Sequence, residues 1–69
     1  MGCIWDEEQY ISGYCFYEFV SNPLPQSGGS YKYCRCTLGE WTPIDEEDAL
    51  DMCTDDEYRH GIIDLCYSD

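Results

Sequence analysis

The sequence predicts an α+β, disulfide-rich miniprotein in which a two- or three-stranded antiparallel sheet is followed by one or two short helices. The 69-residue chain contains six cysteines, an even number that is typical of a disulfide framework. Its first half is rich in aromatic residues, whereas its second half is acidic and has apolar residues at helical spacing. We expect one domain over residues 1–69, with a β part over about 3–41 and an acidic helical part over about 42–67.

The composition leaves little material for a core. Leu, Ile, Val and Phe make up 12 of the 69 residues, and the net charge is −12. This combination is typical of disordered chains, because too little apolar surface can be buried. Disulfides oppose disorder, since each contributes about 2–4 kcal/mol in a small domain. We expect all six cysteines to be paired: Cys3, Cys15, Cys34, Cys36, Cys53 and Cys66.

The first half of the chain is predicted to form β-strands. Residues 9–21 are rich in Tyr, Phe, Ile and Val, which favour a pleated surface. The prolines and glycines of 22–30 predict a loop. A second strand is expected over 31–37, and a third short strand is expected to begin at Trp41. Alternation along the second strand puts Cys34 and Cys36 on one face, directed towards a core or a neighbouring element.

The second half of the chain is predicted to be helical. Thr42-Pro43-Ile44-Asp45 predicts a helix start with proline at the first helical position and acids in the first turn. Ala49, Met52 and Cys53 then share one stripe. Thr54-Asp55-Asp56-Glu57 resembles a capping box that opens a second short helix. The helical spacing in that segment is carried by Tyr58, Ile62, Leu65 and Cys66.

Catalysis is not expected. The one histidine, His60, lies between Arg59 and Gly61, which is typical of a surface residue. No serine or cysteine stands in a nucleophile motif. We predict no catalytic residue, no metal ligand and no cofactor. The alternative is a zinc site, which would need free thiols and would use Cys34, Cys36, Cys53 and His60.

The acids and the tyrosines together predict a binding protein. Residues 40–69 contain eleven acids against one basic residue, and such a field attracts a basic partner, although solubility alone is the alternative explanation. Seven tyrosines exceed what so small a core can use, and tyrosine is enriched at interfaces. Both tryptophans are equally good candidates for the core. We expect the binding residues to be Trp5, Tyr10, Tyr14, Tyr17, Trp41, Asp55, Asp56 and Tyr58.

Two tyrosines are also candidate sulfotyrosines. Tyr10 follows Asp6-Glu7-Glu8, and Tyr58 follows Asp55-Asp56-Glu57. Tyrosine among acids is the setting in which sulfation occurs in the secretory pathway. Sulfation would add further negative charge to either site.

The cysteines predict a secreted, extracellular protein, because disulfides persist in oxidising compartments. We take Met1-Gly2 to stand where a secretion leader was removed, whereas a native start would imply a cytosolic protein with free thiols. Myristoylation of Gly2 is not expected, since Asp6 stands where that motif requires Ser or Thr. No apolar run approaches the ~18 residues of a membrane span. Asn22 precedes Pro23 and is not in a glycosylation sequon.

One spacing pattern is more specific than the composition. Cys3 is followed by Tyr10 and Gly13, and later comes Cys34-Arg35-Cys36-Thr37-Leu38-Gly39-Glu40-Trp41. This pattern resembles the amino-terminal half of a von Willebrand factor type C module over about residues 3–41. The chain departs from the module at Tyr31, where a cysteine is expected, and at Cys15, which the module lacks. The helical second half is also unlike the module.

The resemblance implies an inhibitor of a host protein. Small secreted proteins similar to such half-modules occur among tick salivary inhibitors, and some bind complement component five. Others of similar size bind chemokines or clotting proteases. By the module's usual pairing Cys3 would join Cys36. One pairing of the remaining cysteines, Cys15 with Cys53 and Cys34 with Cys66, would tie the strands to the helical segment.

We therefore expect a monomeric inhibitor that binds an extracellular host protein with a basic patch, and that binds neither nucleic acid nor membrane. Complement component five is the first candidate target. Two alternatives from other classes remain. A secreted effector or pheromone-like signalling protein would have the same composition. An intracellular nucleic-acid mimic would present its carboxylates in place of phosphates.

Overall fold

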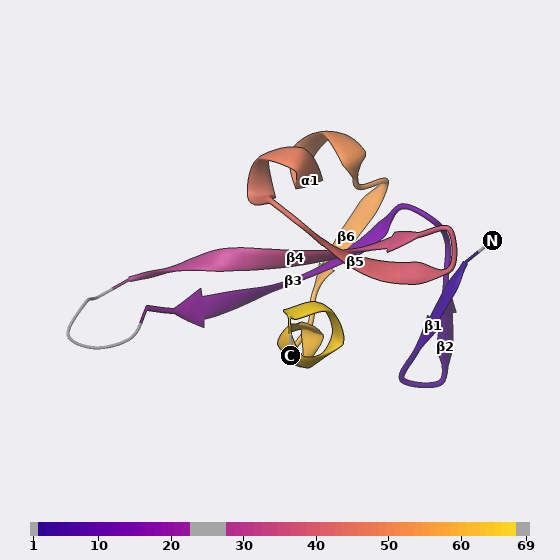
Figure 1. Cartoon of the computed structure of the whole chain (residues 1–69), viewed down its shortest axis with the longest axis horizontal. Coiled ribbons are helices and arrows are strands. Elements are labelled where there is room, and N and C mark those ends of the chain that lie inside the picture. Colours follow the sequence, from indigo (N-terminus) through magenta and orange to yellow (C-terminus); the bar gives the residue numbers. More distant parts are fainter. Residues whose placement is uncertain (1, 23–27, 68–69) are drawn as a thin grey trace.

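The computed structural model describes residues 2–22 and 28–67, so Met1 and the middle of the predicted loop lie outside it. A hairpin of β1 (Cys3–Trp5) and β2 (Glu8–Tyr10) stands beside a four-stranded sheet (Figure 1). The order in that sheet is β5-β4-β3-β6, and β6 runs parallel to β3. Its strands are β3 (Tyr14–Ser21), β4 (Gly29–Thr37), β5 (Glu40–Ile44) and β6 (Asp55–Tyr58).

The disulfide-rich character agrees with the prediction, but the chain is mostly β rather than α+β, since a strand, β6, follows α1. The predicted sheet was also wrong in two respects. The main sheet has four strands, and one of its neighbouring pairs is parallel. The single strand expected over 9–21 is divided by a turn at residues 11–13. Gly13 allows this division, because it adopts φ +95°, which is accessible to glycine at little cost. Its N–H donates to the Cys36 carbonyl at 2.7 Å.

The predicted second helix was also wrong. Residues 55–58 form β6, because the Thr54 N–H donates to the Gly13 carbonyl at 3.0 Å and the Arg59 N–H to the Tyr17 carbonyl at 2.9 Å. These bonds hold the intervening residues extended beside β3, so tertiary pairing outweighs the local capping pattern. In the described part of the chain after β6, the helical element is η1, one π-helical turn over Ile63–Tyr67.

The first helix exists but begins later than expected. Pro43 is a residue of β5, opposite Cys34, and α1 spans Glu46–Met52. Asp45 precedes the helix in an extended conformation. Ala49 is the one buried residue of α1, whereas Leu50 is 81% exposed. The helix therefore adds little apolar burial to the protein.

The two faces of the sheet have different coverings (Figure 1). The α1 side is joined to the sheet by Cys15–Cys53. The opposite side carries η1 through Cys34–Cys66 and the β1–β2 hairpin through Cys3–Cys36. These three bridges confirm that all six cysteines are paired, and they match the pairing considered above. Cys34 and Cys36 are fully buried, as their shared face predicted.

The core lies on the η1 side of the sheet. Its fully buried members are Phe16, Cys34 and Ile62. Partly buried side chains from the hairpin, the sheet and η1 surround them: Trp5, Tyr10, Tyr14, Trp41, Ile63, Leu65 and Cys66. Within the described ranges, no helix is long and apolar enough to cross a membrane.

Candidate binding surface

Five aromatic side chains form a row on the α1 face of the sheet. Tyr17 of β3 lies opposite Tyr33 of β4 on one side and Tyr58 of β6 on the other. Phe19 lies opposite Tyr31. Residues opposite each other in a sheet project from the same face, and so do residues two apart along a strand. We call Tyr17, Phe19, Tyr31, Tyr33 and Tyr58 the aromatic row.

The rings of the row are in continuous contact. Tyr17 is at the centre, with its ring centroid 5.3 Å from Tyr33, 5.4 Å from Tyr58 and 5.7 Å from Tyr31. Tyr31 and Phe19 continue the row at 5.3 Å. Most of these contacts are edge-to-face, a favourable arrangement for aromatic pairs. The ring-to-ring contacts hold the exposed rings in defined positions.

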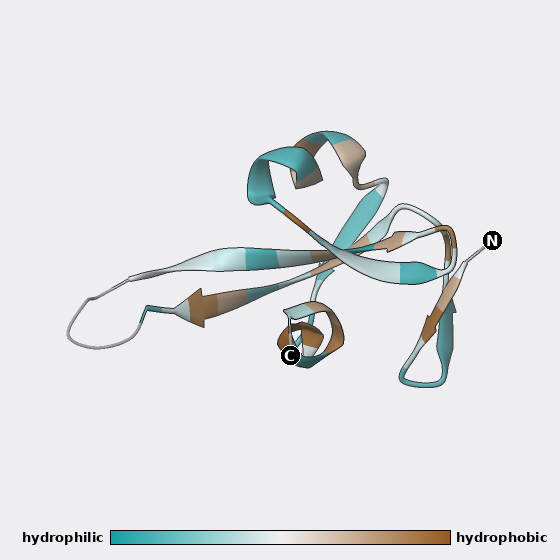
Figure 2. Cartoon of the chain, viewed as in Figure 1, coloured by the Kyte–Doolittle hydropathy of each residue, from teal (hydrophilic) through white to brown (hydrophobic). Residues whose placement is uncertain are grey.

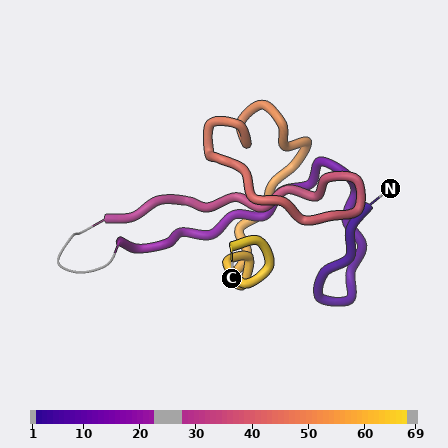
Figure 3. Tube along the Cα trace, in the orientation of Figure 1, coloured from indigo at the N-terminus to yellow at the C-terminus, as the bar shows by residue number. Residues whose placement is uncertain are grey.

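Much of this row is open to solvent. Phe19, Tyr31 and Tyr58 are each 42–43% exposed. Beyond Tyr17 and Tyr33 the pairing with β5 and β6 ends, so β3 and β4 continue as a two-stranded arm (Figure 3). The far end of β3 on this arm is hydrophobic (Figure 2). The row therefore runs from the body of the sheet onto a projecting ribbon.

Two acids border the row. Asp56 lies on the same face of β6 as Tyr58. Glu46 is the first residue of α1, which follows β5 in the chain. Partial burial raises the pKa of Tyr33, and the charges of Glu46 and Asp56 raise it further. Negative charge from these two carboxylates therefore acts on the row at Tyr33.

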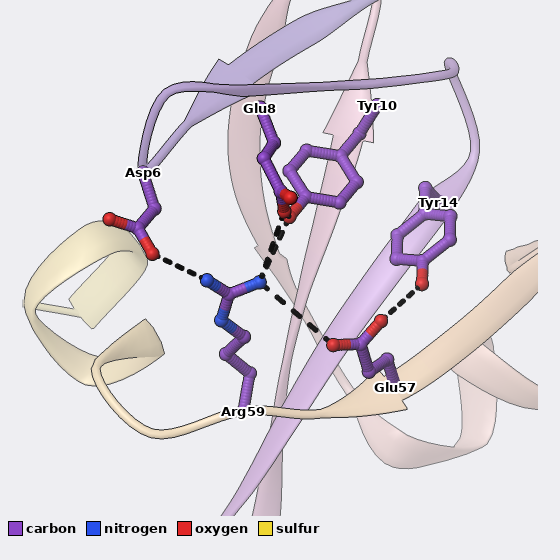
Figure 4. A network of polar contacts seen from close by, with 6 residues as sticks. All are labelled: Asp6, Glu8, Tyr10, Tyr14, Glu57 and Arg59. Carbon is purple, nitrogen blue, oxygen red and sulfur yellow. Dashed lines mark hydrogen bonds and ion pairs between the residues drawn. The ribbon is translucent and has the colours of Figure 1, made fainter.

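The opposite face holds a second cluster, centred on Arg59 (Figure 4). Its guanidinium donates to Asp6 at 2.6 Å and to the Tyr10 hydroxyl at 2.9 Å. It also lies over the Trp5 ring, 5.1 Å from the centroid. Because Asp6 and Tyr10 belong to the hairpin, Arg59 joins the hairpin to the end of β6. Its role here is structural.

Two tyrosine hydroxyls of this cluster are held by carboxylates (Figure 4). Tyr14 donates to Glu57 at 2.7 Å, and this bond together with partial burial raises the pKa of Tyr14 to about 12. Tyr10 donates to Glu8 at 2.7 Å. Partial burial and that bond raise the pKa of Tyr10. Both hydroxyls are occupied within the protein.

The structure divides the predicted binding residues between the two faces. Trp5, Tyr10, Tyr14 and Trp41 pack around Phe16 on the η1 side. Tyr17, Asp56 and Tyr58 belong to the α1 side. Asp55 lies opposite Tyr14 and so belongs to the η1 side, where its carboxylate accepts the Asp56 N–H at 2.9 Å. Sequence reasoning missed three members of the row, although pairing of the two strands it predicted would have brought them together: Phe19, Tyr31 and Tyr33.

The candidate sulfotyrosines differ in access. The Tyr10 hydroxyl is bonded to Glu8 and Arg59. The Tyr58 hydroxyl has no hydrogen-bond partner among residues 2–22 and 28–67, and Tyr58 is 42% exposed. Sulfation therefore stays a prediction, with Tyr58 the more accessible site. The zinc alternative was wrong, because Cys34, Cys36 and Cys53 are all in disulfides.

The fold and this surface define a small disulfide-rich β protein with an exposed aromatic row. Comparison with protein-family models, with curated proteins and with solved structures finds no match for the chain. The resemblance to half of a von Willebrand factor type C module therefore stays a prediction.

Proposed function

We propose that this protein is a secreted, non-enzymatic binding protein that inhibits an extracellular host protein. It binds that protein through the aromatic row. The observation that carries the proposal is the exposure of Phe19, Tyr31 and Tyr58, each 42–43% accessible. Aromatic rings dominate binding energy at protein interfaces. Tyrosine in particular buries a large area at a small entropic cost.

The scaffold supports this role because the row is ordered before any partner arrives. Its central ring, Tyr17, contacts three other rings, and the strands beneath are joined to α1 and η1 by disulfides. A preorganised surface loses less conformational entropy on binding than a mobile one does. Less of the favourable contact energy is then needed to offset ordering of the surface, so the affinity for the partner is higher.

Complement component five is the target we would test first, followed by chemokines and clotting proteases. The support is the resemblance of residues 3–41 to a half-module found in small secreted inhibitors. The Cys3–Cys36 bridge agrees with the pairing that this resemblance implies.

The experiment is a pull-down from plasma with the oxidised protein, analysed by mass spectrometry. The test variant is Phe19→Ser/Tyr31→Ser/Tyr58→Ser, which changes only exposed members of the row. The control variant is Ile4→Ser/Ile11→Ser/Leu50→Ser, in which the replaced side chains are 65–81% exposed and lie outside the row. Intact mass and circular dichroism check that both variants fold and keep three disulfides.

We expect the wild type and the control variant to recover the same plasma protein, and the row variant to recover at least ~10-fold less, since losing three interface anchors removes well over 1.4 kcal/mol of binding energy. Equal recovery by the row variant would contradict binding through the row. Recovery of no protein by the wild type would contradict the inhibitor proposal and favour a signalling protein.

A further inference from the structure

On the face opposite the aromatic row, two basic side chains of this chain lie over aromatic rings of the same chain. Lys32 lies over the ring of Tyr67 at 5.9 Å, and Arg59 lies over Trp5 at 5.1 Å and Phe16 at 5.6 Å. These contacts use the attraction between a cation and the negative face of an aromatic ring.

Within the described residues, no Lys or Arg lies over a ring of the aromatic row, and the one basic side chain in contact with it is His60, whose ring is 5.3 Å from Tyr58 in an edge-to-face arrangement. The third Lys or Arg residue of the chain, Arg35, shares the row's face of β4, but its guanidinium donates to the Met52 carbonyl at 3.3 Å and to the Thr37 hydroxyl at 2.8 Å. All three Lys and Arg residues of the chain are thereby accounted for. The rings of Tyr31 and Tyr58 each contact Tyr17, and none of the three lies under a Lys or Arg of this chain.

We propose that the aromatic row receives arginine or lysine side chains of the partner protein, held by cation–π contact with the rings; this inference rests on the proposed function. Glu46 and Asp56 border the row and contribute negative charge there. They attract a cation before contact and oppose an anion. A second copy of this chain does not fit the surface, because each copy carries a net charge of −12.

The spacing of the rings suits an extended basic segment. Neighbouring ring centroids in the row are 5.3–5.7 Å apart. Side chains on one face of an extended segment are about 6.6 Å apart, twice the rise per residue. Arginine at alternate positions would therefore place successive guanidinium groups near successive rings. Arginine is favoured over lysine, because its planar group can stack on one ring and still donate to Asp56.

The test uses a probe of defined chemistry, a capped peptide of alternating arginine and glycine. The control peptide has citrulline in place of arginine, which keeps the shape and removes the charge. Binding is followed by nuclear magnetic resonance of the oxidised protein, with amide shifts read in the row and at Ile11 and Leu38 outside it. We expect the arginine peptide to shift the row residues and the citrulline peptide to leave them unchanged.

Two variants separate the rings from the acids. Tyr31→Leu/Tyr58→Leu keeps apolar surface but removes the aromatic faces, and we expect each change to weaken binding of the arginine peptide about 2- to 5-fold. Glu46→Gln/Asp56→Asn keeps the rings, so the row residues should still shift, with a weaker dependence on salt.

Equal binding of the two peptides would overturn the inference. So would shifts confined to the acidic residues, or unchanged affinity in Tyr31→Leu/Tyr58→Leu. None of these outcomes would affect the plasma experiment, because a row that binds through apolar contact alone would still lose its partner in the serine variant.

Discussion

Arg59 lies over the face of Trp5, with its guanidinium carbon 5.1 Å from the ring centroid, while the same group forms an ion pair with Asp6 at 2.6 Å. Trp5 is the last residue of β1, and Asp6 is the first residue of the hairpin turn. Asp6 and Glu7 both adopt positive φ in this turn. Such a conformation is unfavourable for residues other than glycine, asparagine and aspartate. The Arg59 contacts thus hold a costly turn in place.

We therefore expect Arg59→Met to lower the denaturant midpoint of the oxidised protein more than Lys32→Met does. Both substitutions keep an apolar stem and remove a cation from a ring, but only the first also removes the Asp6 and Tyr10 contacts. The measurement is urea unfolding followed by tryptophan fluorescence. Equal midpoints for the two variants would show that the Arg59 cluster does not stabilise the hairpin.

Replacing Ile62 tests whether the core lies on the η1 side of the sheet. Its side chain is fully buried against Phe16 and Cys34. We expect Ile62→Ala to lower the free energy of unfolding by about 2–5 kcal/mol, because the substitution leaves a cavity. Ile4→Ala is the matched control, since Ile4 is 67% exposed, and should change stability by less than about 0.5 kcal/mol. A small effect at Ile62 would contradict a core on the η1 side.

Stability should fall in strong alkali through Tyr14. The pKa of this hydroxyl rises from 10.0 to about 12 on folding, because the hydroxyl donates to Glu57 and is partly buried. Below the unfolded pKa both states keep the proton, and the contribution is complete. Between these two pKa values the unfolded state loses its proton more readily, so stability falls as the pH rises.

The measurement for Tyr14 is the ultraviolet absorbance of tyrosinate together with alkaline unfolding. Glu57→Gln should move the Tyr14 titration back towards its ordinary pKa of 10.0, and Tyr14→Phe should remove it. Both variants should have a shallower loss of stability above that pH than the wild type. A wild-type titration in which every tyrosine ionises near pKa 10.0 would contradict the Tyr14–Glu57 bond.

Helix α1 should depend on one disulfide. It buries only Ala49, and Cys53 follows directly after it. We expect Cys15→Ala/Cys53→Ala to cost about 2–4 kcal/mol. Amide exchange should accelerate most over residues 46–52, while β3 and β4 keep their protection. If protection is lost equally throughout the protein, the helix and the sheet form one cooperative unit instead.

The sequence was informative where local pattern and tertiary structure agree. The alternation of residues 31–37 predicted correctly that Cys34 and Cys36 share a buried face. It was misleading at residues 54–58, where local capping chemistry favours a helix. Their extended conformation depends on bonds from Thr54 to Gly13 and from Arg59 to Tyr17, partners far away in the sequence.

The candidate surface was predictable only in part for a similar reason. An excess of tyrosines indicated binding, but composition does not assign a ring to a face. Tyr10 and Tyr17 look alike in sequence. The strand register places Tyr17 opposite Tyr33 on the α1 side, whereas the hairpin folds Tyr10 onto Phe16 on the η1 side.

The parallel pairing of β6 with β3 has a consequence for the order of folding. The β3–β4 hairpin joins segments near in sequence, whereas Tyr14 pairs with Asp55 only after the intervening chain has turned back through β4, β5 and α1. Contacts between distant segments form slowly, because loop closure must come first. In oxidative refolding Cys15 and Cys53 should therefore meet late, and intermediates with an unpaired β3 edge should accumulate before them.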